Sequence, residues 1–216
     1  AWSRRCNAAC DFCAAKTQAS ASPSLDIPKE TAFQFLDDAA ELGVKGISLI
    51  SDGESSLVDY YAESIEYATA LGIKVGLGTN GIAFDRPLLE RILPHVTYMR
   101  FNFSAGERKR YSQIMGVKEP IYDKVMQNIR DSMDIVRSGN LATNVNMNLV
   151  CDPKDSDQVV PFARIAKELN GVVRDDSKPN KKLVSGNFEW ACSTVMVLGK
   201  PIARIVNLAV TAGDPV

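Results

Sequence analysis

The chain has 216 residues, a formal net charge of −1 at pH 7, 45% hydrophobic residues and 24% charged residues. This length and composition predict one folded domain with a sizeable core and argue against an intrinsically disordered chain. The small net charge gives no general electrostatic basis for binding nucleic acid or an anionic membrane, and no apolar run reaches the roughly 20 residues of a membrane span. The five cysteines are odd in number and crowd into one loop, so a reducing, cytoplasmic compartment is expected.

The first feature along the chain is a cluster of three cysteines, Cys6, Cys10 and Cys13, in the spacing C-x3-C-x2-C. Three thiolates this close can converge on one soft metal centre, whereas structural zinc and a plain [4Fe–4S] carrier each take four ligands. A cubane held by three cysteines keeps one iron free for a small molecule. From ligand count alone, a zinc loop with a fourth ligand such as Asp11 or a distant cysteine remains an alternative.

After this loop, the sequence predicts helices and strands in alternation. The first helix is predicted from an apolar stripe at helical spacing, with Pro28 at its start and Gly43 after its end. The alternation implies βαβ units, a parallel sheet and, through right-handed crossovers, a barrel or partial barrel. Strands are predicted at residues 46–51, 72–78, 96–103 and 143–150. Further helices are predicted at residues 59–71, 87–93, 121–136 and 156–169.

The alternation breaks after residue 170. Residues 174–182 are polar and charged and are predicted to form a loop, and residues 195–198 suit a strand. Residues 201–210 fit either a strand or a short helix, and periodicity does not decide between them. The chain is therefore divided into a core over residues 1–170 and an irregular C-terminal segment over residues 171–216, which is not expected to be a separate domain.

The cysteine spacing, with the aromatic Phe12 just before the last cysteine, resembles the cluster loop of the radical SAM superfamily. The resemblance covers about residues 3–170. It implies a [4Fe–4S] cluster on Cys6, Cys10 and Cys13, with S-adenosylmethionine (SAM) chelated to the open iron and cleaved reductively to a 5′-deoxyadenosyl radical. It also implies an α/β fold, a partial (β/α)6 TIM-like barrel with parallel strands. Only five residues precede Cys6, so the N-terminal strand of that barrel is expected to be largely missing.

The same resemblance assigns cofactor-binding roles to residues at the carboxyl ends of the strands, where active sites of α/β barrels lie. Phe12 is expected near the adenine. Gly53 and Glu54 are expected to help hold the methionyl amino group; they lie in Ser-Asp-Gly-Glu-Ser, where the family has Gly-Gly-Glu-Pro. Asn102 and Ser104 are expected to hold the ribose.

A stripe of three asparagines, Asn144, Asn146 and Asn148, follows one face of the last strand of the core at a period of two. A purely structural parallel strand is usually continuous Val, Ile and Leu, and a buried polar group without a partner costs roughly 1–3 kcal/mol. The stripe therefore predicts a wet, ligand-holding lumen, with Asn146 among the cofactor-binding residues. A solvent-facing strand in an incomplete barrel is the alternative.

The family resemblance further implies a peptide or small-metabolite substrate and an electron donor such as flavodoxin or ferredoxin. It predicts no catalytic residue for the substrate step. Cys151, at the end of the same strand, is expected to be a buried thiol. Two other functions remain open: a non-catalytic zinc or iron–sulfur binding module, and an RNA-modifying radical SAM methylase, which the net charge of −1 disfavours.

Overall fold

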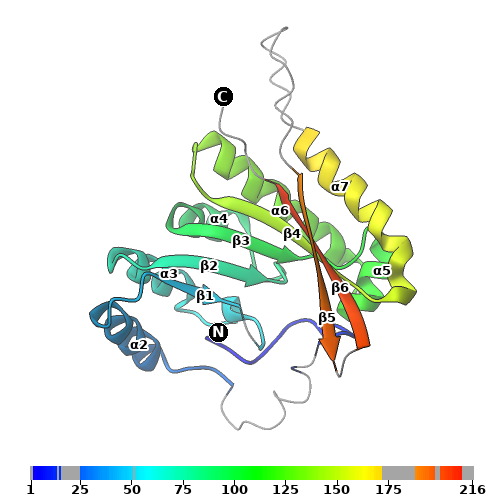
Figure 1. Cartoon of the computed structure of the whole chain (residues 1–216). Coiled ribbons are helices and arrows are strands. Elements are labelled where there is room, and N and C mark those ends of the chain that lie inside the picture. The colour runs from blue at the N-terminus through cyan, green and yellow to red at the C-terminus, as the bar shows by residue number, and fades with distance from the viewer. Residues whose placement is uncertain are drawn as a thin grey trace, which may run out of the picture.

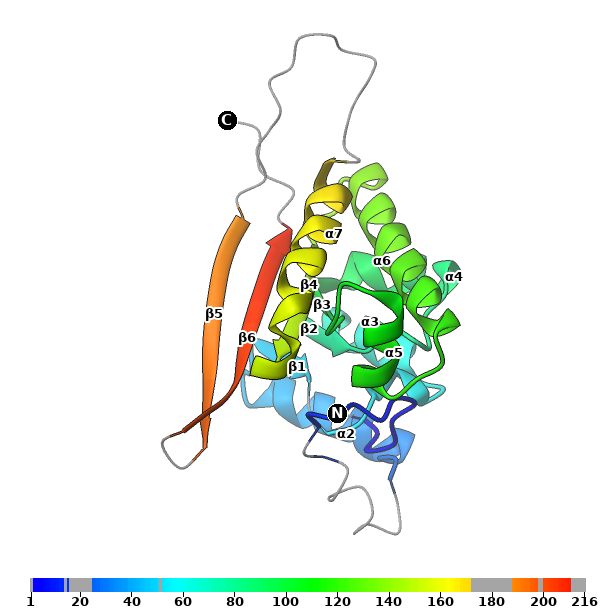
Figure 2. The same cartoon turned by 90° about the vertical axis from the view of Figure 1, so that its right-hand side faces the viewer.

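The computed structural model describes residues 2–13, 15, 25–50, 52–171, 188–197 and 200–210, and from residue 170 onward it describes the backbone only. Helices cover the outer face of a six-stranded sheet (Figures 1 and 2). The strands are β1 (Gly46–Leu49), β2 (Lys74–Thr79), β3 (Val96–Asn102), β4 (Asn144–Cys151), β5 (Phe188–Val197) and β6 (Lys200–Val210). The α-helices are α2 (Lys29–Glu41), α3 (Tyr61–Ala70), α4 (Arg86–Ile92), α5 (Arg108–Met115), α6 (Pro120–Ser138) and α7 (Val159–Gly171). Short 3-10 helices are η1 (Ser55–Leu57), η2 (Leu93–His95) and η3 (Pro153–Gln158).

The sheet has the order β1-β2-β3-β4-β6-β5, and its first four strands are parallel neighbours. Helix α3 connects β1 to β2, α4 connects β2 to β3, and α5 with α6 connects β3 to β4. This is the arrangement of the parallel part of an α/β barrel, in which strands alternate with helices that pack outside. The predicted fold class and its four parallel strands are confirmed.

Alternation along β3 separates the core from the inner face of the sheet. Met99 and Phe101 are fully buried, and they belong to one face of the strand. Arg100 and Asn102 lie on the opposite face and line the cavity described below. The sequence thus places apolar side chains against the helices and polar ones on the inner side, where a ligand can be held.

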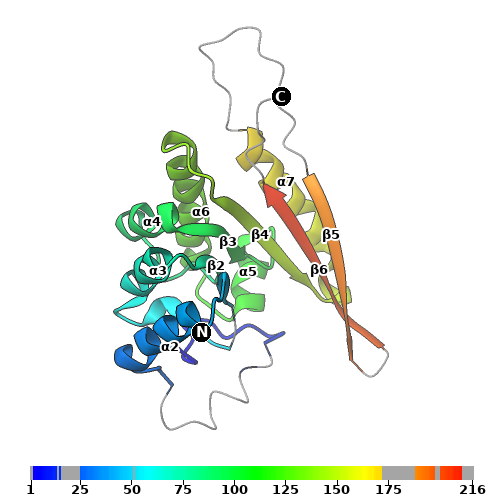
Figure 3. The ribbon, with the colours of Figure 1, turned by 60° about the vertical axis from the view of Figure 1, so that its left-hand side comes forward.

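The C-terminal segment differs from the prediction. The sequence predicted an irregular segment after residue 170, with a strand at residues 195–198 and either a strand or a short helix at residues 201–210. The structure instead has two longer strands, β5 and β6, in an antiparallel hairpin. Strand β6 also pairs antiparallel along β4, from Val145↔Val210 to Cys151↔Arg204, as Figure 3 shows at the edge of the sheet. The prediction of irregular structure is wrong for these strands. The apolar spacing of residues 201–210 suits a helix as well as a strand, and pairing with β4 is a tertiary contact that periodicity does not report.

The start of the chain agrees with the prediction of no complete first strand. Within residues 2–5, Ser3 forms one isolated antiparallel bridge with Asp26, and the Arg4 N–H donates to the Leu25 carbonyl. Among the residues that the structure describes, β1 pairs only with β2. No helix in this described part is both long and apolar enough to cross a membrane.

Candidate functional site

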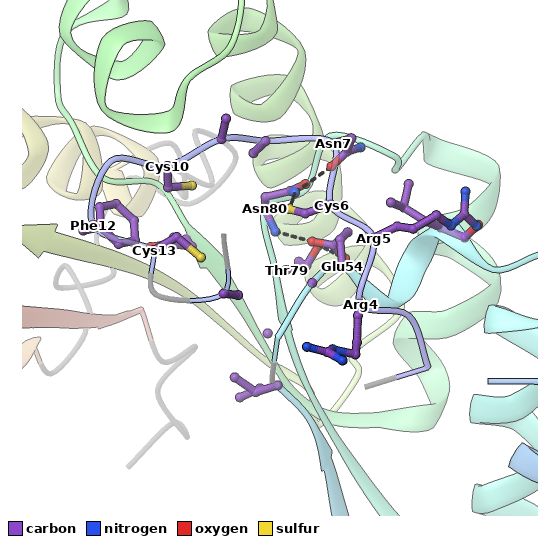
Figure 4. A pocket seen from close by; sticks show the side chains of 18 of the residues that line it. Arg4, Arg5, Cys6, Asn7, Cys10, Phe12, Cys13, Glu54, Thr79 and Asn80 are labelled. Carbon is purple, nitrogen blue, oxygen red and sulfur yellow. Dashed lines mark hydrogen bonds between the residues drawn. The ribbon is translucent and has the colours of Figure 1, made fainter. Parts of the chain in front are cut away.

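A cavity of about 890 Å³ lies at the carboxyl ends of the parallel strands, beside the cysteine loop (Figure 4). Its wall combines the loop, the turn after β1 and the ends of β2, β3 and β4. Seven of the nine residues predicted to bind cofactor or metal line it: Cys6, Cys10, Phe12, Cys13, Gly53, Glu54 and Asn102. The other two, Ser104 and Asn146, are not part of the wall.

The cysteine loop is fixed to the C-terminal end of α5. The N–H of Ala9 donates to the Met115 carbonyl at 3.0 Å, and the N–H of Asp11 donates to the Ile114 carbonyl at 2.9 Å. The last carbonyls of a helix have no partner inside it, so the loop satisfies groups that otherwise need water. Gly116 follows with φ of +61°, and a Cβ there would lie 2.4 Å from the Ala9 oxygen. The close contact between the loop at Ala9 and the backbone of Gly116 therefore requires a residue without a side chain.

The residues before Cys6 pack equally closely on the turn after β1. Gly53 has φ of +84°, and a Cβ on it would lie 2.5 Å from the Ser3 oxygen and from the Arg4 carbonyl carbon. The N–H of Glu54 donates to the Arg5 carbonyl at 2.7 Å. Gly53 thus joins the cysteine loop to the sheet as well as lining the cavity.

The carboxylate of Glu54 joins the turn after β1 to the end of β2. It is 3% exposed. It accepts hydrogen bonds from the Ser56 hydroxyl at 2.7 Å, the Thr79 hydroxyl at 3.0 Å and the Asn80 N–H at 2.8 Å. A buried carboxylate needs such donors, because an unpaired buried charge is strongly unfavourable. These bonds position the turn, and the predicted contact of Glu54 with a methionyl amino group stays a prediction.

Asn80 connects the end of β2 to the cysteine loop. Its side-chain amide donates to the Asn7 Oδ1 at 2.7 Å and to the Cys6 Sγ at 3.6 Å (Figure 4). Although solvent reaches the Cys6 side chain, partial burial in the cavity wall raises the pKa of its thiol, and the N–H of Ala8 opposes this effect. The sequence had marked Asn80 only as a further candidate, because Asn-Gly is also a common turn pair.

The three cysteine side chains lie on the concave side of the loop (Figure 4). Cys10 is buried, with its Sγ 3.7 Å from the Met115 Sδ, and Cys13 is half-buried. Within the described residues, no three His, Cys, Asp or Glu side chains are placed together closely enough to hold a single metal ion. Among the described residues of the wall, Glu54 is the other side chain of these types, and its carboxylate is occupied by hydrogen bonds. Three thiols on one cavity wall are the donor set that fits a [4Fe–4S] cluster with three protein ligands.

The polar ends of β3 and β4 meet in one layer. Asn102 and Asn148 are register partners, and both line the cavity. Ser104 is fully buried behind this layer, where its hydroxyl donates to the Asn102 Oδ1 at 3.0 Å and accepts from the Val150 N–H at 3.3 Å. In this structure Ser104 therefore orients Asn102 rather than facing the cavity.

Asn146, which was expected to bind cofactor, is not among the residues that line the cavity. It is the register partner of Arg100, and its buried Oδ1 has no hydrogen-bond partner. Asn148, two residues further along the same face, occupies the position in the wall. The cofactor-binding role expected of Asn146 therefore stays a prediction, although its register partner Arg100 and the neighbouring Asn148 both line the cavity.

Comparisons with known proteins agree with this geometry. The model of the radical SAM superfamily matches residues 2–163. The AdoMet-dependent heme synthase of Methanosarcina barkeri is 22% identical over 173 residues, which cover 77% of this chain and 46% of that protein. Its chain and those of the solved structures below are more than twice as long as the part that this chain spans.

Solved structures support the fold. Streptococcus suis SuiB bound to S-adenosylmethionine matches with a TM-score of 0.59 and 18% identity, over 77% of this chain and 36% of that one. Native anSMEcpe with bound AdoMet matches with a TM-score of 0.51 and 14% identity, over 67% of this chain and 41% of that one. With the family model covering most of its length, the chain belongs to the radical SAM superfamily.

Proposed function

We propose that this chain is the cluster- and SAM-binding part of a radical SAM enzyme. In this proposal Cys6, Cys10 and Cys13 hold a [4Fe–4S] cluster, and SAM occupies the adjoining cavity. When bound, the cluster and SAM would supply a 5′-deoxyadenosyl radical for abstraction of a hydrogen atom from the substrate. The observation that carries the proposal is that three thiols and the polar ends of three parallel strands line one cavity.

The chain's own residues bind and orient in this mechanism. Asn102, held by Ser104, presents its amide at the level of Asn148, which suits the hydroxyls of a ribose. Phe12 is 37% exposed on the loop, where an aromatic ring can cover the adenine. Gly53 and Glu54 form the wall on the opposite side, where the methionyl group is proposed to bind. In these roles the protein's residues would hold SAM in one orientation and shield the radical from water.

The substrate is proposed to be a peptide or a small metabolite. SuiB has been solved with its precursor peptide SuiA, and that structure matches this chain with a TM-score of 0.61 and 19% identity, over 78% of this chain and 36% of that one. The relative from Methanosarcina is named as a heme synthase, which supports a small molecule. An electron donor such as flavodoxin or ferredoxin and a cytoplasmic location complete the proposal.

A zinc-binding module is the alternative that the cysteine spacing left open. It requires a fourth ligand near the triplet, for which Asp11 was one candidate. In the structure the Asp11 carboxylate lies 3.5 Å from the Lys154 ammonium, and Asp11 is not part of the cavity wall. This arrangement favours the open cluster over the closed zinc site.

The test is release of 5′-deoxyadenosine by the anaerobically reconstituted chain, given dithionite and SAM. Replacing any one of Cys6, Cys10 or Cys13 by Ala is expected to abolish release, because a missing thiolate destabilises the whole cluster. Cys151→Ala is the matched control: this buried thiol lies outside the cavity wall, so iron content and release should persist. Iron-loaded wild-type protein that releases no 5′-deoxyadenosine would count against the proposal.

Asn102→Ala separates the SAM site from the cluster site. It is expected to weaken SAM binding and leave the iron content unchanged, because the Asn102 amide belongs to the strand layer and not to the cysteine loop. Iron content and the SAM dissociation constant are measured on the same preparation. Loss of iron in this variant would show that the division of roles is mistaken.

A further inference from the structure

Two arginines in the cavity wall, Arg4 and Arg100, have no ion pair or hydrogen bond through their side chains among the residues that the structure describes. The Nε of Arg4 is buried without a partner, and Figure 4 shows this side chain directed away from Arg5. Arg5, by contrast, binds the Asp26 carboxylate through two nitrogens, at 2.8 and 2.5 Å. Arg4 and Arg100 therefore keep donors that the folded chain leaves unused.

The two arginines belong to neighbouring parts of one cavity wall, which also contains Ile50. The backbone of Arg4 packs on Gly53, in the turn that follows Ile50. The side chain of Ile50 fills the space over Gly78, whose register partner in β3 is Arg100. Arg4, Ile50, Gly78 and Arg100 therefore all belong to the wall of the same cavity.

The charge balance of the wall favours an anion. Among the described residues of the wall Glu54 is the acidic side chain, and its carboxylate already accepts hydrogen bonds from Ser56, Thr79 and Asn80. A guanidinium presents its N–H groups in a planar fork that matches the two oxygens of a carboxylate. No described acidic group of the wall competes for Arg4 or Arg100.

A second unused group lies nearby on the strands. Asn148 is 5% exposed and lines the cavity, and its Oδ1 has no hydrogen-bond partner. It is the register partner of Asn102, which is on the same face of β3 as Arg100 and roughly 7 Å further along the strand. An unsatisfied buried acceptor costs free energy unless a ligand donates to it.

We propose that Arg4 and Arg100 bind a carboxylate group of the substrate, and that Asn148 accepts a hydrogen bond from an N–H or O–H group of the same molecule. This inference rests on the proposed function, because it names the chemical class of the substrate of that site. A carboxylated small molecule and a peptide with Asp or Glu share this chemistry. SAM carries a carboxylate of its own, so the test must separate it from the substrate.

The experiment measures binding to the reconstituted full chain at saturating SAM by isothermal titration calorimetry. The probes are succinate and a tetrapeptide of glutamates, with succinamide and a tetrapeptide of glutamines as uncharged controls. The variants are Arg4→Gln and Arg100→Gln, and the matched control is Arg164→Gln, which removes an exposed arginine on α7, outside the wall. Arg100→Lys keeps the charge but loses the fork. Circular dichroism verifies the fold of each variant.

At least one carboxylate probe is expected to bind the wild-type chain with SAM present, while its amide counterpart does not. Each Arg→Gln variant should weaken that binding about tenfold or more, Arg100→Lys should weaken it less, and Arg164→Gln should leave it unchanged. Binding of succinate alone, or of the peptide alone, identifies which source of the carboxylate the site accepts.

The proposal is overturned if neither carboxylate probe binds the wild-type chain, or if Arg164→Gln weakens binding as much as Arg100→Gln. It is also overturned if the arginine variants weaken binding of SAM but not of decarboxylated SAM, because the arginines then hold the carboxylate of SAM itself. If the wild-type chain does not bind SAM at all, the proposed function is contradicted instead. Binding of the carboxylate probes by the wild-type chain and by the arginine variants then tests the role of Arg4 and Arg100 separately.

Discussion

Gly53 shows how a single residue joins the cluster loop to the sheet. Its φ of +84° is a conformation that side-chain-bearing residues rarely adopt, and backbone atoms of Ser3 and Arg4 occupy the place of a Cβ. The family resemblance implied that Gly53 helps to hold the methionyl amino group of SAM. In this structure the close approach is by the chain's own segment before Cys6.

Gly53→Ala is expected to lower the free energy of unfolding by more than the strain of a positive φ alone would. Gly43→Ala is the matched control, because Gly43 has φ of +76° and open space where a Cβ would be. Strain at such positions costs about 1–3 kcal/mol, and both variants should show it in urea unfolding. Only Gly53→Ala should also lower the iron bound after reconstitution. Equal losses of stability with normal iron in both variants would contradict the account.

At the scale of elements, helix α5 is the platform of the cysteine loop. Two loop N–H groups, from Ala9 and Asp11, bind the carbonyls of Met115 and Ile114 at its C-terminal end. The other end of α5 is also held, since the Gln158 Oε1 accepts from the Gly106 N–H at 3.2 Å. A helix fixed at both ends gives the cluster loop a rigid support.

Gly116→Ala tests this support. Gly116 and Gly72 both follow a helix and have positive φ, +61° and +77°, but only at Gly116 does a Cβ meet another segment, at Ala9. We expect Gly116→Ala to displace the loop and speed the loss of iron to a chelator severalfold, with Gly72→Ala close to wild type in that rate. Iron release is followed by absorbance. The same release rate in both variants would mean that α5 does not hold the loop.

The sequence predicted the elements whose signals are local. The cysteine spacing, the apolar periodicity of α6 and the β-forming runs of the parallel strands are each contained in one segment, so each could be read directly. The sequence did not indicate that Asn148 rather than Asn146 lines the cavity, because that depends on how the strand packs against other segments, and the binding role of Asn146 stays a prediction. The role of Arg4 and the contacts of the loop with α5 were not predicted for the same reason, since both depend on contacts with distant segments of the chain.

At the scale of the whole molecule, the sheet is mixed. Strand β4 pairs with β3 on one side and β6 on the other, whereas β1 pairs only with β2 among the described residues. An unpaired strand edge exposes backbone groups to solvent, and a strand paired on both sides does not. The antiparallel hairpin therefore covers the edge of β4 that faces away from β3.

Hydrogen exchange tests this pairing. All amides of β4 are expected to exchange slowly, because successive N–H groups point to opposite neighbours and both neighbours are present. In β1, only the amides directed at β2 should be slow. Mass spectrometry or NMR resolves the two strands. Alternating fast and slow amides in β4 would show that β6 does not cover it in solution.

The central claim is that three cysteines hold a cluster with one iron left open for SAM. Its most direct test is electron paramagnetic resonance of the reconstituted, dithionite-reduced chain with and without SAM. We expect a reduced [4Fe–4S] signal that shifts on addition of SAM, and that is lost in Cys6→Ala but kept in Cys151→Ala. A purified chain that holds stoichiometric zinc, or a reduced signal that SAM leaves unchanged, would contradict it.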